Sequence, residues 1–153
     1  MKSVFLRHHG AFFAGLIDKT ESPVTIRRVN LEDNHLYEIN SNIGIYITYS
    51  SKRLSPWTVT LPPEQVKLIF ERMNQYLHFY LVIVCEFEFS AVINREQISD
   101  LLSPRRENAS SITIRTGHER SLAVSGTEGN LRTKLHKSKA YEQLLDIVNA
   151  TTE

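Results

Sequence analysis

The first half of the chain reads mainly as β-strand, because apolar and polar positions alternate along it. In residues 43–50 the three isoleucines and Tyr49 fall on one face of an extended strand, and the intervening residues fall on the other face. Shorter runs of the same kind predict strands over 24–29, 35–39 and 58–61. Asparagine- and serine-containing stretches between these runs indicate turns.

Residues 1–22 carry a mixed pattern that fits two structures. Four apolar residues fit one face of a helix: Phe12, Phe13, Leu16 and Ile17. Gly10 and Gly15 equally fit an arm of a hairpin. Of the two, we expect a strand.

The second half alternates helices with strands. A helix is predicted to begin at Pro62-Pro63, since proline is tolerated in the first helical turn. Its apolar residues recur at helical spacing: Val66, Ile69, Phe70, Met73 and Leu77. The unbroken apolar run 79–85 then predicts a central strand covered on both faces, with 90–93 as its antiparallel neighbour.

Three further elements follow towards the end of the chain. Asn94 and Gln97 have the spacing of a capping box, which predicts a short helix after Asn94. Residues 112–115 and 122–124 indicate a hairpin, and Ser138 is placed to cap a last helix. The expected fold is a single α+β (mixed α/β) domain over residues 1–153. It has a central, mostly antiparallel or mixed sheet with two or three flanking helices.

Composition and charge indicate the cellular compartment of the protein more clearly than its function. The formal net charge is +1, so a nucleic acid or a membrane would have to be recognised by a local patch. Cys85 is the single cysteine and has no partner for an internal disulfide, which favours a reducing compartment. Neither a signal peptide nor an apolar run long enough for a membrane span is evident. We therefore expect a cytoplasmic protein without a membrane partner.

The segment 49–57 is the most unusual stretch of the chain. Hydroxyl groups, two cations and an indole lie close together after a strong strand, and such groups can hold phosphate oxygens and stack on a base. The candidate phosphate contacts are Ser51, Lys52, Arg53 and Ser55. The simpler interpretation is a solvated turn with Trp57 in the core.

A second basic segment, 132–139, precedes the last predicted helix and contains no acid. Its candidate nucleic-acid contacts are Arg132, Lys134, Lys137 and Lys139. A run of like charge can supply sequence-independent affinity for a phosphate backbone. It is more often simply a solvated face.

Metal-dependent cleavage of a phosphodiester needs carboxylates that hold a divalent cation, and often a lysine near the attacked phosphate. Glu38 and Asp33, ahead of the strand that leads to Lys52, are the candidate ligands, with Mg²⁺ as the expected ion. Glu32 and the pair Glu86 and Glu88 are further candidates. Ordinary surface carboxylates are the simpler interpretation for all of them.

Other common chemistries find little support. The six histidines show no zinc-ligand spacing with cysteine or with one another. The strings typical of P-loops, of dinucleotide-binding turns and of the serine nucleophile elbow do not occur. These observations disfavour acyl transfer, P-loop nucleotide hydrolysis and dinucleotide chemistry.

The string 45–57 resembles the signature of a family of small uncharacterised bacterial proteins. Its members share a K-Y-S-[ST]-K-R-x-S-P-W core, then a helix, then an apolar strand that ends in cysteine. The resemblance covers roughly residues 35–135, and Thr48 stands where lysine is usual. It implies no assigned activity.

The order of elements also resembles that of the restriction-endonuclease-like nucleases, including the archaeal Holliday-junction resolvases. That resemblance implies that Lys52 is the lysine of the E-x-K motif, with Ser50 at the position of the acid and Glu38 as the acid that takes its role. It also implies that an active protein would be a Mg²⁺-dependent endonuclease with a non-standard motif.

Two functional hypotheses follow. The first is a nucleic-acid-associated domain with a nuclease-like core, degenerate or active, that contacts the phosphate backbone of DNA or RNA. The alternative is a non-catalytic protein-interaction subunit or adaptor of a larger bacterial system, with Trp57, Tyr46 and the face of Glu86 and Glu88 as contact points.

Overall fold

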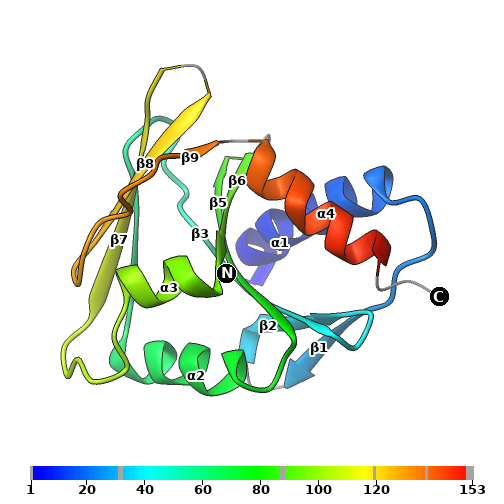
Figure 1. Ribbon diagram of the computed structural model, residues 1–153, viewed down its shortest axis with the longest axis horizontal. Coiled ribbons are helices and arrows are strands. Elements are labelled where there is room, and N and C mark those ends of the chain that lie inside the picture. Colours follow the sequence, from blue (N-terminus) through cyan, green and yellow to red (C-terminus); the bar gives the residue numbers. More distant parts are fainter. Residues whose placement is uncertain (1, 31–32, 87–88, 119, 137, 151–153) are drawn as a thin grey trace.

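The computed structural model describes residues 2–30, 33–86, 89–118, 120–136 and 138–150. The side chains of residues 2–5, 30, 33–34 and 86 lie outside this description. Within these limits the chain forms an α+β fold, as the sequence predicts. It consists of two sheets with helices packed against them (Figure 1).

The larger sheet is mixed and has the strand order β1-β2-β3-β5-β6. Its strands are β1 (Ile26–Asn30), β2 (Asp33–Ile39), β3 (Ile43–Tyr49), β5 (His78–Glu86) and β6 (Phe89–Asn94). β3 and β5 pair in parallel, from Ile43 opposite His78 to Tyr49 opposite Val84, while the other neighbours are antiparallel. β5 thus lies inside the sheet, which confirms the prediction from its apolar run.

The smaller sheet is antiparallel, with the order β4-β7-β8-β9. It consists of β4 (Trp57–Leu61), β7 (Ser110–Thr116), β8 (Ser121–Gly126) and β9 (Leu135–His136). The alternation in 58–61 and the hairpin pattern predicted its strands. Their assembly into a second sheet was not predicted, because β4 pairs with a strand about fifty residues later.

Four helices cover the sheets in the described part of the chain: α1 (Lys2–Lys19), α2 (Pro63–Met73), α3 (Arg95–Leu101) and α4 (Lys139–Ala150). α2 has Pro62 as its N-cap and a proline in its first turn, as predicted. The predicted capping box begins α3, where Asn94 and Gln97 bond reciprocally. The strand expected in residues 1–22 is wrong, because this segment forms α1.

Burial explains why α1 forms despite its glycines. Phe12, Phe13 and Leu16 are buried against the larger sheet, beside Leu144 and Val148 of α4. Tertiary packing of an apolar face is the usual source of stability for a helix in a protein. Figure 1 shows α1 and α4 together on one side of the larger sheet.

The opposite face of the larger sheet packs on α2, α3 and the smaller sheet. Successive side chains of β5 point to opposite faces of the sheet and so belong to two cores. Leu81 and Ile83 pack in the core beside α2 and α3, and Val82 and Val84 pack in the core beside α1 and α4. Trp57 belongs to the core beside α2 and α3. Leu77, predicted to extend the apolar stripe of α2, lies beyond the end of that helix and is 74% exposed.

Candidate functional site

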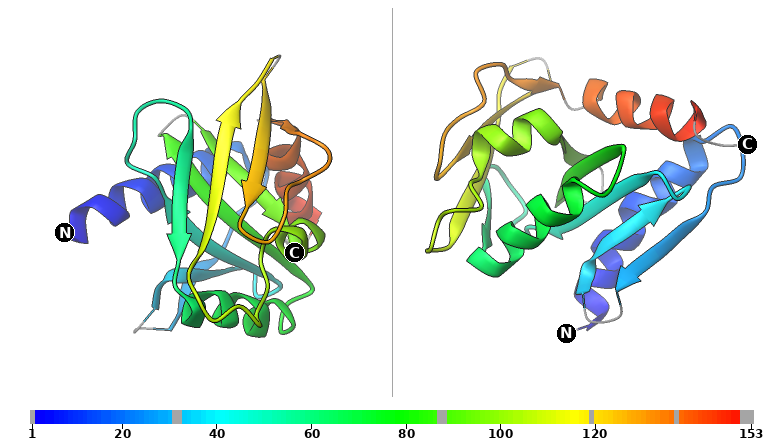
Figure 2. Two further views of the ribbon diagram at one scale, coloured as in Figure 1. Left: turned by 90° about the vertical axis from the view of Figure 1, so that its left-hand side faces the viewer. Right: turned by 60° about the horizontal axis from the view of Figure 1, so that its bottom comes forward.

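A cavity of about 510 Å³ opens where β3 ends and the chain crosses to β4. Its described lining consists of His8, Cys85 and the loop residues 50–54, and we call it the loop cavity. It lies beyond the carboxyl ends of β3 and β5, the one parallel pair of the described sheets. Ligands of open sheets commonly bind at the carboxyl ends of parallel strands. The left view of Figure 2 shows this loop beside the N-terminal half of α1.

Buried groups hold the loop in place. Trp57 is 3% exposed, its indole Nε1 donates to the Lys52 carbonyl at 3.0 Å, and its ring lies edge-on to Phe89 at 5.3 Å between centroids. The Ser55 hydroxyl oxygen accepts from the backbone N–H of Thr116 at 3.0 Å. Ser55, a predicted phosphate contact, therefore ties the loop to the smaller sheet and is not among the described residues that line the loop cavity.

The described lining of the loop cavity carries positive charge. Lys52 and Arg53 are exposed, and neither forms an ion pair with an acid that the structure describes. The hydroxyl-bearing residues Ser50 and Ser51 line the cavity beside them, and no acid is among its described lining residues. Cations and hydroxyls around a solvent-open cavity are suited to an anionic group such as a phosphate.

His8 closes the cavity from the side of α1. Its ring stacks on that of Tyr49, with 4.2 Å between centroids and 16° between planes, and only 8% of the residue is exposed. Sequence reasoning missed His8 because residues 1–22 were expected to form a strand. The helical spacing of Phe12, Phe13 and Leu16 was the available signal, since it places His8 on a helix that packs against the sheet.

Glu38, the predicted catalytic acid, lies in β2 beside the start of β3, whereas the loop cavity lies at the end of β3. It is paired with Gly44, whereas Lys52 follows Tyr49 at the far end of the strand. At about 3.3 Å per residue, the strand alone separates Gly44 from Tyr49 by roughly 16 Å. The structure therefore does not bring Glu38 and Lys52 together as a catalytic pair.

The carboxylate of Glu38 is engaged in a structural cluster. Arg27 Nε donates to Oε1 at 2.9 Å and the Tyr76 hydroxyl donates to Oε2 at 2.7 Å. Burial and the bond to Glu38 raise the pKa of Tyr76 to about 12, so this hydroxyl remains a donor. Gly44 makes room for the ring of Tyr76, because a Cβ there would lie 2.6 Å from Tyr76 Cδ2.

The described residues hold no group of three or more histidine, cysteine, aspartate or glutamate side chains that could bind a metal ion. The side chain of Asp33, the second predicted ligand of Mg²⁺, lies outside the described residues. The same holds for Glu32, for Glu88 and for the side chain of Glu86. Among the described residues there is thus no cluster of three such side chains for the ion that the nuclease resemblance implies.

The basic segment 132–139 lies around β9 and the start of α4 and lines a separate cavity through Lys134, His136 and Lys139. Arg132 is exposed and lines neither cavity. Lys137 lies outside the described residues. The structure therefore brings Ser51, Lys52 and Arg53 together, and places Lys134 and Lys139 at a second location.

The aromatic contact points expected of an interaction module are buried. Tyr46 is 1% exposed and its hydroxyl donates to Gln65 Oε1 at 2.6 Å. Trp57 fills the core, as described above. The prediction that these two side chains are displayed for a partner is wrong, because both contribute their rings to the packing between the sheets.

Comparison with known proteins does not identify a relative. No family model, curated protein or solved structure matches the chain. Among the described helices, none has the length and apolar character needed to cross a membrane.

Proposed function

We propose that this chain is a nucleic-acid-binding domain that contacts the phosphate backbone through the loop cavity. The observation that carries the proposal is the cavity of about 510 Å³ at the carboxyl ends of β3 and β5, with two exposed cations and two serines in its described lining. Its size lies in the range of pockets that hold small organic ligands. One nucleotide of a strand is therefore a suitable occupant.

The roles follow from the positions of the groups. Lys52 and Arg53 supply charge to phosphate oxygens, with Arg53 able to form two parallel bonds. Ser50 and Ser51 supply neutral donors. His8, whose ring is stacked on Tyr49, forms the wall on the α1 side as an aromatic surface beside the phosphate site.

The test is a binding titration by fluorescence anisotropy between about 50 and 200 mM salt, with a labelled single-stranded oligonucleotide. The double variant Lys52→Ala/Arg53→Ala is compared with Lys67→Ala/Arg105→Ala, which removes the same charge from exposed positions outside the loop cavity. The slope of log K against log salt is negative, and the loss of two phosphate contacts makes it less steep by about 1.4 for a single strand. We expect this change for the first variant and an unaltered slope for the second.

Two outcomes contradict the proposal. One is the absence of oligonucleotide binding by the unaltered protein at low salt. The other is an equal loss of affinity in both double variants, which would reflect net charge alone. Competition by inorganic phosphate and by a mononucleotide distinguishes a backbone site from a site for a free phosphate compound, since the backbone site requires the oligonucleotide for tight binding.

A further inference from the structure

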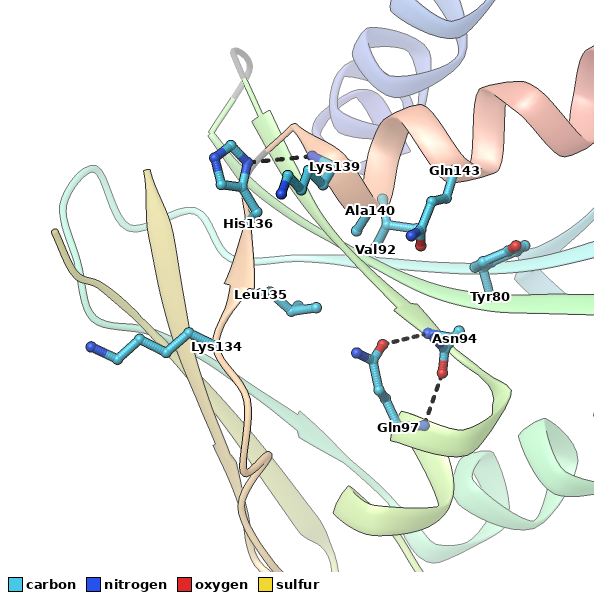
Figure 3. A pocket seen from close by; sticks show the side chains of 10 residues that line it. All are labelled: Tyr80, Val92, Asn94, Gln97, Lys134, Leu135, His136, Lys139, Ala140 and Gln143. Carbon is cyan, nitrogen blue, oxygen red and sulfur yellow. Dashed lines mark hydrogen bonds between the residues drawn. The ribbon is translucent and has the colours of Figure 1, made fainter. Parts of the chain in front are cut away.

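A second cavity, of about 170 Å³, lies between the start of α3, β6, β9 and α4 (Figure 3). We call it the α4 cavity. Its floor and walls include three apolar side chains, Val92, Leu135 and Ala140. Polar side chains surround them: Tyr80, Asn94, Gln97, Lys134, His136, Lys139 and Gln143. The cavity therefore combines an apolar surface with several hydrogen-bonding groups.

Gln97 has a fixed orientation in this cavity. Its Oε1 accepts from the backbone N–H of Asn94 at 3.0 Å, and the Asn94 side chain in turn accepts from the backbone N–H of Gln97 at 3.0 Å. Because the carbonyl end is held by the capping box, the amide Nε2 is the end that remains to donate. Figure 3 shows this end directed towards the space between Leu135 and Gln143.

Gln143 and Tyr80 complete the polar lining. Gln143 is exposed on α4, and its amide points down into the same space in Figure 3. Burial raises the pKa of Tyr80, so its hydroxyl stays protonated and can donate. Among the described residues neither side chain has a hydrogen-bond partner, and the Gln143 amide, which points into the cavity, is therefore available to a ligand.

The size of the α4 cavity indicates the class of ligand. An apolar cavity of about 150 Å³ in another protein holds one benzene ring. A volume of about 170 Å³ therefore fits one planar ring rather than a fused or branched molecule. Donors and acceptors at its rim require a ring with polar edges, and glutamine and asparagine amides are the side chains that pair with the edges of nucleobases.

The mouth of the cavity is basic. His136 Nδ1 accepts from the Ser138 backbone N–H at 3.2 Å and from that of Lys139 at 3.4 Å, so Nε2 is the ring nitrogen that carries a hydrogen and can donate. The Lys139 ammonium lies beside His136 in Figure 3, whereas the Lys134 side chain points away from the cavity. Lys139 and His136 are thus placed to contact a phosphate attached to a ligand in the cavity.

From these contacts we propose that the α4 cavity binds one unpaired base of a single-stranded nucleic acid. Gln97 and Gln143 contact the edge of the base, Val92 and Leu135 contact its face, and Lys139 contacts the adjoining phosphate. This inference rests on the proposed function, and it adds that bases as well as the backbone are recognised. The bases must be unpaired, because a paired base cannot insert between these side chains without leaving its duplex.

The experiment compares two oligonucleotides of about ten nucleotides, one of deoxycytidine, whose base is a single ring, and one with the same backbone without bases. The readout is the ratio of their dissociation constants. For the unaltered protein we expect the abasic strand to bind roughly tenfold more weakly, since contacts to one base are typically worth a factor of about five or more. Gln143→Leu removes one contact to the edge of the base and should bring the ratio close to one, and its melting temperature verifies that it folds.

The double variant Lys52→Ala/Arg53→Ala separates the two proposals. It should weaken both oligonucleotides by the same factor and keep the ratio. Equal binding of both strands by the unaltered protein, or a ratio that survives Gln143→Leu, overturns the base site and leaves the backbone site standing. If neither strand binds, both proposals are wrong.

Discussion

The stability of the fold should fall on mild acidification because of His9. This residue is 2% exposed in α1, and its Nδ1 lies 2.9 Å from the Tyr37 hydroxyl of β2. Burial, and secondly the nearby charges of His35 and His8, lower the pKa of His9 to about 4 from 6.5. Protonation would place a charge between the helix and the sheet, where it is poorly solvated.

The sign and size of the effect follow from linkage. Between these two pKa values the unfolded chain binds a proton at His9 and the folded chain does not, so acid favours unfolding. The contribution is fully retained above pH 6.5 and is lost as the pH falls towards 4. From about pH 7.5 to pH 4.5 the loss is roughly 2.5 kcal/mol, which is a large share of the stability of a small domain.

Urea unfolding followed by circular dichroism, over this pH range, measures the effect. His9→Gln is the matched variant, because its amide does not titrate and retains a polar group opposite Tyr37. The difference in unfolding free energy between the two proteins removes the common contribution of the carboxylates and of the other histidines. Between about pH 7.5 and pH 4.5 we expect the unaltered protein to lose about 2–3 kcal/mol of unfolding free energy relative to His9→Gln. A difference that does not vary with pH would refute the argument.

Three substitutions test other parts of the structure. Trp57→Ala should cost about 3–5 kcal/mol in chemical unfolding, since a buried aromatic ring is removed, and an unchanged midpoint would place the indole at the surface. Gly44→Ala should cost about 1–3 kcal/mol, because the added methyl group meets the ring of Tyr76, and a calorimetric melt would show no change if that ring swings away. Glu38→Gln should cost below about 1 kcal/mol, because Arg27 is exposed, and should leave oligonucleotide affinity unchanged; lost binding would restore a functional role to Glu38.

Much of the fold is visible in local patterns. The alternation in 43–50 placed β3, the apolar run 79–85 placed β5, and the spacing of Asn94 and Gln97 placed the start of α3. These signals are local, because each depends on residues that are neighbours in the same element. The pairing of β4 with β7 and the packing of α1 on the larger sheet depend on contacts between distant segments. Periodicity shows which face of an element is buried, but it does not show which distant segment covers that face.

The candidate site shows the same division. The composition of residues 49–57 made them a candidate phosphate-binding loop beside the simpler interpretation of a solvated turn, and Ser51, Lys52 and Arg53, though not Ser55, line one cavity. The antiparallel register that carries Glu38 to the opposite end of β3 could not be read from the sequence. The helical spacing of Phe12, Phe13 and Leu16 could place His8 on a helix, but it could not show that this helix brings His8 to the loop cavity.

The central claim is that the loop cavity is where a nucleic acid strand lies. Its most direct test is a titration of the ¹⁵N-labelled protein with a single-stranded oligonucleotide, followed by amide chemical shifts. The account predicts that the largest shifts fall on residues 50–54 and on His8, and that Lys52→Ala/Arg53→Ala abolishes them. Shifts confined to other surfaces, with the amides of 50–54 unmoved at saturation, would contradict it.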